Sequence, residues 1–140
     1  MIWIEHIGAF PQHLFDRMTE EAKRDFDAVG PEVAKQIFEG SPRKAVLWLD
    51  DEPIMICGVY EHSLLSGNAE FWALPLVGLR KRPLAAAKGL RKLADYLVRR
   101  WPRVHVRVRE DVKGAKRFAE FSGFRTVLES GGVHVMKRAS

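Results

Sequence analysis

The sequence contains a single cysteine, Cys57, so no disulfide can form within the chain and a reducing compartment is expected. Cys57 lies in the apolar run 54–60, which favours a buried, inert thiol over a nucleophile. No apolar run approaches the ~18 residues that a membrane span needs. The first residues also lack the basic lead and the apolar core of a signal peptide. We therefore expect a soluble, unprocessed protein that is not secreted.

Other absences exclude common activities. The sequence has no Gly-x-Ser-x-Gly elbow and no Gly-Lys-Ser/Thr loop, which argues against a hydrolase of that type and against a nucleoside triphosphatase. No pair of histidines has the spacing of a helical metal site, and one cysteine cannot build a structural zinc site. The sequence predicts no metal. With 46% hydrophobic and 29% charged residues, the 140 residues are expected to form one globular domain, 1–140.

Charge is divided unevenly along the chain. The residues before Arg80 include 6 basic and 13 acidic side chains, whereas Arg80 to Arg117 holds 14 basic and 3 acidic ones. A stretch this basic favours polyanions, phosphorylated cofactors or an acidic protein face. The alternative is a helix whose basic side is simply solvated, facing the acidic N-terminal helices.

The stretch from Ala69 to Trp101 organises the chain. Ala69 to Leu74 is rich in aromatic residues without Gly or Pro, as expected of a mostly buried strand. A basic loop follows, and Pro83 is suited to the first position of a helix that ends before Pro102. Because free backbone N–H groups and the helix dipole coincide at a helix N-terminus, this loop is a natural anion site.

The remaining pattern predicts alternating strands and helices. Strands are expected at 2–7, 44–49, 53–61, 69–74, 103–109, 124–128 and 133–136, and helices at 10–29, 31–39, 83–101 and 112–122. Asp111 is expected to cap the last helix and Gly123 to end it. The fold class is therefore α/β, with a mixed, mainly antiparallel sheet of about seven strands and four helices.

This order, together with the segment Ala115 to Phe124, resembles the GNAT superfamily of N-acetyltransferases. The resemblance implies a GNAT-like fold with a V-shaped opening between the strands Ala69 to Leu74 and Arg103 to Arg109, where acetyl-CoA inserts. Its loop signature is Gln or Arg, two residues, Gly, one residue, then Gly or Ala. Arg80 to Ala85 is the nearest match, with Pro83 in place of the first glycine.

The resemblance implies a set of cofactor-binding residues. A pantetheine and pyrophosphate loop would comprise Leu74, Leu76, Arg80, Lys81, Arg82 and Ala85. Pro83 removes an N–H donor there, although the three cations can hold a pyrophosphate electrostatically. Two alternatives therefore stay open: acetyl-CoA is bound, or the cofactor has been lost.

The resemblance also concerns catalysis. Ala119 stands where family members often carry a tyrosine whose hydroxyl protonates the departing thiolate, and Val112 stands where an asparagine is common. Glu70 is the one carboxylate on its strand and is the candidate general base. The alternative is that Glu70 is simply an exposed glutamate at the start of a strand.

A narrower resemblance is to the degenerate GNAT-like internal or morphogenesis-associated virion proteins of short-tailed podophages. The residues that carry it are Glu70 to Trp72, the basic helix, and the tail helix without the tyrosine. It implies a phage or prophage protein, located in the host cytoplasm or the virion, with little or no catalytic activity. Its partners would be other virion proteins, or DNA through the basic surface Arg80 to Arg117. The alternative function is acetyl-CoA-dependent acetylation of a primary amine, on a small molecule or a protein, and no membrane partner is expected.

Overall fold

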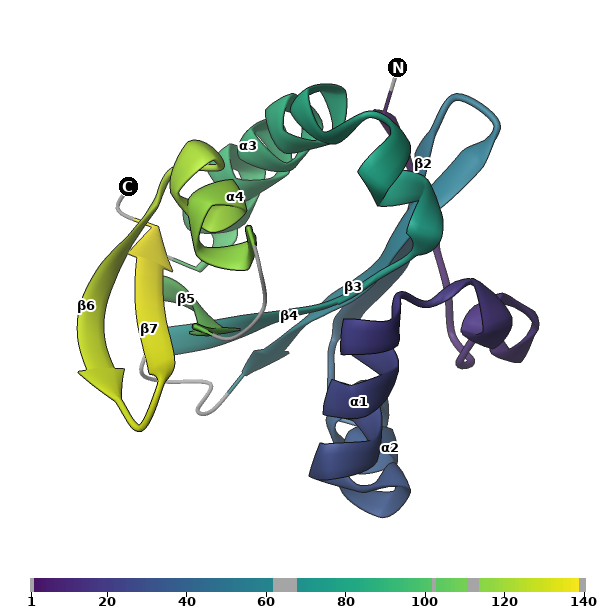
Figure 1. The fold of residues 1–140 in the computed structure, drawn as a ribbon, viewed down its shortest axis with the longest axis horizontal. Helices are drawn as coiled ribbons and strands as arrows, with labels where there is room; N and C mark the ends of the chain where they lie inside the picture. Colours follow the sequence, from purple (N-terminus) through teal and green to yellow (C-terminus); the bar gives the residue numbers. More distant parts are fainter. Residues whose placement is uncertain (1, 62–67, 102, 111–113, 139–140) are drawn as a thin grey trace. The chain divides into compact units, whose positions relative to one another are not determined.

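The computed structural model of the chain describes residues 2–61, 68–101, 103–110 and 114–138 (Figure 1). Its elements, two of them short 3-10 helices (η), are β1 (Ile2–His6), η1 (Gln12–Arg17), α1 (Glu20–Val29), α2 (Pro31–Glu39), β2 (Arg43–Leu49), β3 (Glu52–Glu61), β4 (Asn68–Pro75), η2 (Val77–Lys81), α3 (Pro83–Arg100), β5 (Arg103–Arg109), α4 (Ala115–Phe121), β6 (Phe124–Ser130) and β7 (Val133–Arg138). The predicted order of strands and α-helices is confirmed. No described helix combines the length and the apolar character that crossing a membrane requires.

The strands of the described residues form one seven-stranded sheet in the order β1-β2-β3-β4-β5-β7-β6. The ladders β1–β2, β2–β3, β5–β7 and β6–β7 are antiparallel, and β4 pairs with β5 in parallel. That parallel ladder joins Asn68–Glu70 to Arg103–His105 and ends there, although both strands continue. The predicted fold class, a mixed and mainly antiparallel sheet with four α-helices, is confirmed.

The chain divides into two compact units. The first comprises Met1–Tyr60 and Trp72–Ala86, and the second comprises Glu61–Phe71 and Ala87–Ser140. β4 and α3 each contribute residues to both units. The single domain expected from the sequence therefore stays a prediction, and each unit is described below by itself.

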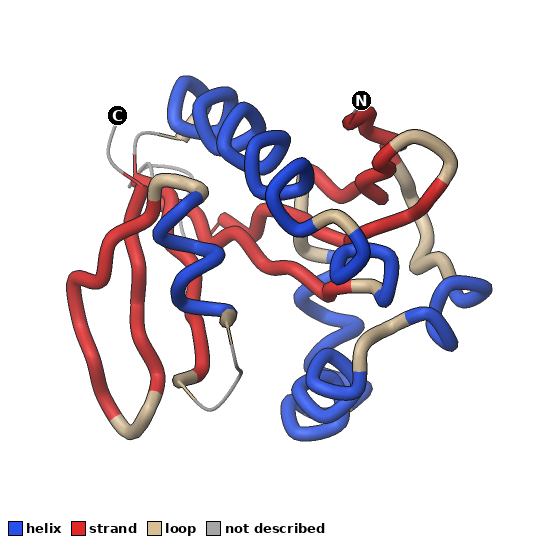
Figure 2. Tube along the Cα trace, turned by 45° about the horizontal axis from the view of Figure 1, so that its top comes forward, coloured by secondary structure: helices blue, strands red, loops and turns tan. Residues whose placement is uncertain are grey.

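The first unit contains the helices α1 and α2, the strands β1 and β2, and β3 up to Tyr60 (helices are blue and strands red in Figure 2). Its core is apolar and is built from both helical and strand segments: Leu14, Met18, Ala22, Val46, Ile56 and Leu76. The turn between β2 and β3 includes Asp50, whose φ of 54° is a left-handed conformation that aspartate tolerates. The predicted strands 44–49 and 53–61 are therefore joined by a tight hairpin turn.

The single helix predicted over 10–29 is wrong. The structure has η1, an extended residue at Met18 with ψ 145°, and then α1. Thr19 explains the break, because its side-chain oxygen accepts a hydrogen bond from the N–H of Ala22 and caps a new helix. The i, i+4 spacing of Leu14, Met18 and Ala22 nevertheless marks the side that packs inward, since all three residues are buried.

In the second unit, α3 has one apolar side, and its residues Leu90, Ala94 and Leu97 are buried. β5 has Val104 and Val108 buried, while its arginines are exposed. α4 lies against β5 and β6, and Gly123, with φ 99°, follows its end as predicted. The predicted cap Asp111 lies outside the described residues.

Candidate anion-binding site

The segment that follows β4 starts from a fixed point in the first unit. The Leu76 N–H donates to the Ile54 carbonyl at 3.0 Å, and the Thr19 N–H donates to the Pro75 carbonyl at 3.1 Å. The Leu76 side chain is fully buried in the core. It therefore anchors the segment and does not face solvent, whereas Leu74 is half-buried against the same core.

η2 then lies directly on the β2–β3 hairpin. A Cβ on Gly78 would come within 2.4 Å of Glu52 Cγ and 2.8 Å of the Pro53 carbonyl oxygen. Only a residue without a side chain permits this approach. Gly78 thus sets the distance at which the cations that follow it meet the acidic hairpin turn.

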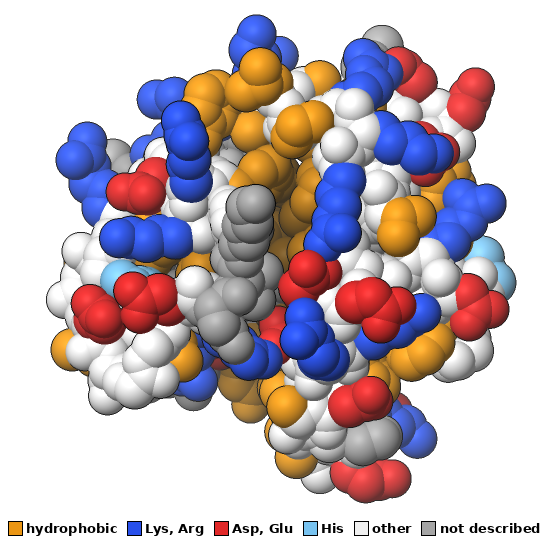
Figure 3. All heavy atoms as spheres, in the orientation of Figure 1, with side chains coloured by type: hydrophobic (Ala, Val, Ile, Leu, Met, Phe, Trp, Pro, Cys, Tyr) orange, Lys and Arg blue, Asp and Glu red, His pale blue; other side chains and the backbone are white. Residues whose placement is uncertain are grey.

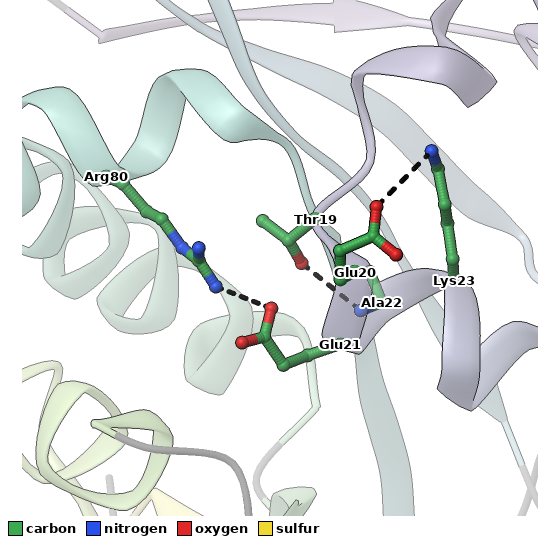
Figure 4. Close-up of polar contacts among 6 residues, drawn as sticks. All are labelled: Thr19, Glu20, Glu21, Ala22, Lys23 and Arg80. Atoms are coloured by element: carbon green, nitrogen blue, oxygen red, sulfur yellow. Dashed lines mark hydrogen bonds and ion pairs between the residues drawn. The ribbon is translucent and has the colours of Figure 1, made fainter.

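Each of the three predicted cations forms an ion pair with a carboxylate of the N-terminal part of the chain. Arg80 Nη2 lies 2.5 Å from Glu21 Oε2, at the start of α1 (Figure 4). Lys81 Nζ lies 3.1 Å from Glu52 Oε1, and Arg82 Nη1 lies 2.6 Å from Asp50 Oδ2. The three side chains therefore spread over two acidic partners on the hairpin and one on α1.

These pairs are at the surface. Between 54% and 67% of the side-chain surface of each cation is exposed. Exposed pairs of this kind contribute about 0–1 kcal/mol each, because water screens them and ordering two long side chains costs entropy. On the face drawn in Figure 3, acidic side chains likewise lie beside basic ones. A phosphate could therefore replace a carboxylate at small cost.

Glu21 is well suited to its place. It lies in the first turn of α1, and its pKa is lowered from the usual 4.5, first by a hydrogen bond from its own backbone N–H. Burial of the carboxylate raises this pKa, but by less than the hydrogen bond lowers it. The positive charge of Arg80 lowers the pKa further. Glu21 is therefore ionised at neutral pH and balances Arg80.

A hollow of about 270 Å³ lies beside two of the pairs. It is lined by Leu49, Asp50, Asp51, Glu52, Gly78, Lys81 and Arg82. Its carboxylates outnumber its cations, so the hollow does not by itself favour an anion. The anion-binding capacity belongs to the cations and to the helix that follows them.

α3 begins at Pro83, directly after the cations, and is 18 residues long. The Ala86 N–H donates to the Arg82 carbonyl at 3.1 Å. Pro83 has no N–H, so Leu84 and Ala85 provide the donors that lack an acceptor within the helix. Together with the helix dipole, these two N–H groups and the nearby cations are suited to a phosphate group.

Glu70 belongs to the second unit. Its carboxylate oxygen lies 3.0 Å from Arg107 Nε of β5, and its side chain is 20% exposed. In the parallel ladder, Glu70 is opposite His105. The ion pair with Arg107 orients the carboxylate, which is a property that a general base needs.

The sequence did not identify the partners of these residues. On the sequence alone, Glu21, Asp50 and Glu52 belong to the acidic part of the chain before Arg80, and Arg107 belongs to the basic stretch Arg80 to Arg117. A signal existed at Thr19, since Thr-Glu-Glu is a frequent start of a helix and places acids in its first turn. No local signal marks the partners, because they are 29 to 59 residues away from the cations.

In the described residues, seven strands and four α-helices, with β4 parallel to β5, have the architecture of the GNAT fold. No model of a protein family matches the chain, and no curated protein matches it.

Several solved structures share the fold over nearly their whole length. A chimera of the spermidine N-acetyltransferase SpeG from Vibrio cholerae and hSSAT is 16% identical, with a TM-score of 0.65 over 99% of this chain and 95% of that one. The N-acetyltransferase PseH from Campylobacter jejuni, in complex with acetyl coenzyme A, is 11% identical, with a TM-score of 0.67 over 100% and 99%. A GNAT family acetyltransferase from Elizabethkingia anophelis with acetyl-CoA bound is 10% identical, with a TM-score of 0.69 over 99% and 98%. At these identities the likeness shows the fold.

Proposed function

We propose that the chain is an N-acetyltransferase that takes an acetyl group from acetyl-CoA and transfers it to a primary amine. The observation that carries the proposal is the group of three cations, Arg80, Lys81 and Arg82, at the N-terminus of the 18-residue α3. The fold supports it, because proteins of the same fold include N-acetyltransferases with acetyl-CoA or CoA bound.

The residues present fit the pyrophosphate of CoA. Two first-turn N–H groups, of Leu84 and Ala85, and the exposed cations offer the donors and the charge that a pyrophosphate requires. Leu74 is half-buried at the end of β4 and could contact the pantetheine. Pro83 removes one donor, and the carboxylates compete for the cations, so we expect weaker binding than a glycine loop would give.

Acetyl-CoA, when bound, supplies an acetyl group activated as a thioester. The substrate amine must lose a proton before it can attack, and Glu70, oriented by Arg107, is the residue proposed to accept that proton. Ala119 carries no hydroxyl, so the proton for the leaving thiolate would come from water.

The test is an assay of thiol release from acetyl-CoA with a panel of amines, including spermidine and a lysine-containing peptide. We expect turnover that falls about a hundredfold to ten-thousandfold in Glu70→Gln, in the range general bases contribute. Arg80→Ala should weaken CoA binding by about tenfold, since it loses hydrogen bonds to a charged group. Glu32→Gln, an exposed glutamate in the first turn of α2, is the matched control. If both Glu70→Gln and Arg80→Ala leave binding and rate unchanged, the proposal is wrong.

A second candidate function is a non-catalytic protein of a phage particle. The ion pairs of all three cations, together with Pro83 and Ala119, favour it, because they leave less for a cofactor to bind and no side-chain acid. Such a protein would act in the host cytoplasm or the virion through other virion proteins or through DNA. DNA binding by the surface Arg80 to Arg117 predicts an affinity that decreases steeply with salt, and a flat salt response would exclude it.

A further inference from the structure

Three potential ligands lie close together in the second unit, on or next to the adjacent strands β5, β7 and β6 (strands labelled in Figure 1). Glu110, Glu129 and His134 each bring one ligand atom to within 4.8 Å of the others. None of these residues belongs to the cationic segment or contacts Glu70 in any described interaction.

The strand register explains the meeting. Glu129 and His134 are direct cross-strand partners on β6 and β7, so their side chains emerge on the same face. Val108 of β5 is the partner of His134 on the other side. Glu110 is two residues beyond Val108 and its N–H donates to the Gly132 carbonyl at 2.8 Å, which continues the ladder and puts its side chain on that same face.

The imidazole of His134 is buried and incompletely paired. Its side chain is 5% exposed, and its Nε2 has no hydrogen-bond partner among the described residues. Buried polar atoms are rarely left without a partner, because an unmade hydrogen bond is costly there. Glu110 Oε1 lies 3.8 Å from Nε2, which is too far for a hydrogen bond.

The other nitrogen of the ring decides what Nε2 can do. His134 Nδ1 lies 3.4 Å from Thr126 Oγ1. When Nδ1 carries the proton and donates toward this hydroxyl, Nε2 has a lone pair, and the two carboxylates lie around it. A metal-binding histidine typically has this arrangement, with its second nitrogen held by a neighbouring oxygen.

We propose that Glu110, Glu129 and His134 bind one Zn²⁺ ion. Ligand atoms around a tetrahedral zinc lie about 3.4 Å apart. The observed separations are 3.8 Å between Nε2 and Glu110 Oε1 and no more than 4.8 Å within the group, so the glutamate side chains must move inward to bind the ion. Both glutamates are exposed and can make this movement. Water would supply the fourth ligand. An imidazole among the ligands favours zinc over Mg²⁺ and Ca²⁺, which prefer oxygen ligands alone.

The inference departs from the sequence expectation of no metal, which considered helical spacings and cysteines only. Here the ligands come from three adjacent strand ends, and only the pairing register brings them together. A bound ion would tie the end of β5 to the terminal hairpin β6–β7.

The test is a calorimetric titration of the full chain with ZnCl₂ at neutral pH, after removal of any polyhistidine tag and treatment with a chelator. We expect one Zn²⁺ per chain with a micromolar or lower dissociation constant, and a higher Tm in its presence. Mg²⁺ and Ca²⁺ should bind at least about tenfold more weakly. Co²⁺ should show the visible absorption of a low-coordinate site with a nitrogen ligand.

Two variants and one control make the result specific. His134→Gln and Glu129→Gln should each weaken Zn²⁺ binding by about tenfold or more, and His13→Gln, a change at an exposed histidine on η1, should leave it unchanged. Glu129 is exposed, so its variant should fold even if His134→Gln does not. Absence of binding, or binding that neither variant weakens, would overturn the proposal. So would Ca²⁺ binding as tightly as Zn²⁺.

Discussion

Replacing Glu21 with glutamine removes the charge that opposes Arg80 and keeps the side chain nearly the same size. Arg80 is 63% exposed and Glu21 28% exposed, so water screens the pair, and it contributes at most about 1 kcal/mol. If Arg80 holds a phosphate of CoA, that energy no longer has to be given up on binding. The dissociation constant for CoA should then fall by up to about fivefold in Glu21→Gln.

The assay is calorimetry with CoA at low salt, repeated at high salt, where the gain should shrink because the pair is screened. Glu39→Gln is the matched control, since it changes the net charge equally and disrupts an exposed pair with Lys35 at 4.0 Å on α2. The reasoning is refuted if Glu21→Gln binds CoA no more tightly than the natural protein. An equal gain in the Glu39→Gln control would refute it as well.

Three further predictions concern the fold of the first unit. Gly58→Ala should lower the free energy of unfolding by about 1–3 kcal/mol, since the new Cβ would lie 2.4 Å from a ring atom of Trp72. Urea unfolding should show this loss, whereas the control Gly8→Ala, at a position with no atom within 4 Å of the new Cβ, should show none. Cys57, whose pKa burial raises to about 12, should not react with a thiol reagent in the native protein and should react on unfolding; rapid native labelling would contradict its burial. The pKa of Glu21 is lowered in the folded protein from 4.5, so the ionised carboxylate stabilises the fold above that pH. The difference in unfolding free energy between the natural protein and Glu21→Gln should therefore shrink as the pH falls below 4.5. A difference that stays constant with pH would contradict this prediction.

Periodicity and punctuation predicted most of the fold. The alternation of Arg103 to Arg109 gave β5 its bounds, and Pro83 gave α3 its first residue, because both signals are local and chemically strict. Periodicity alone does not reveal the break at Thr19, because the i, i+4 spacing of the apolar residues Leu14, Met18 and Ala22 continues across it. The spacing of apolar residues indicates which side chains are buried, whereas a capping residue indicates where a helix begins.

The candidate sites depend on contacts that sequence order hides. The cationic segment was predicted from its own residues, but its carboxylate partners come from α1 and the β2–β3 hairpin, and they weaken the field that the sequence suggested. The group of Glu110, Glu129 and His134 was missed for the same reason, since only strand register brings its members together. The assignment of Glu70 as a base stays a prediction.

Titration of the purified protein with CoA and acetyl-CoA by calorimetry at low salt, with Pro83→Gly in parallel, tests the central claim most directly. We predict one-to-one binding of both ligands to the natural protein in the micromolar range, tightened in Pro83→Gly because a backbone N–H is restored at the start of α3. Absence of binding in both proteins, each shown to be folded, would contradict the claim that this segment binds CoA.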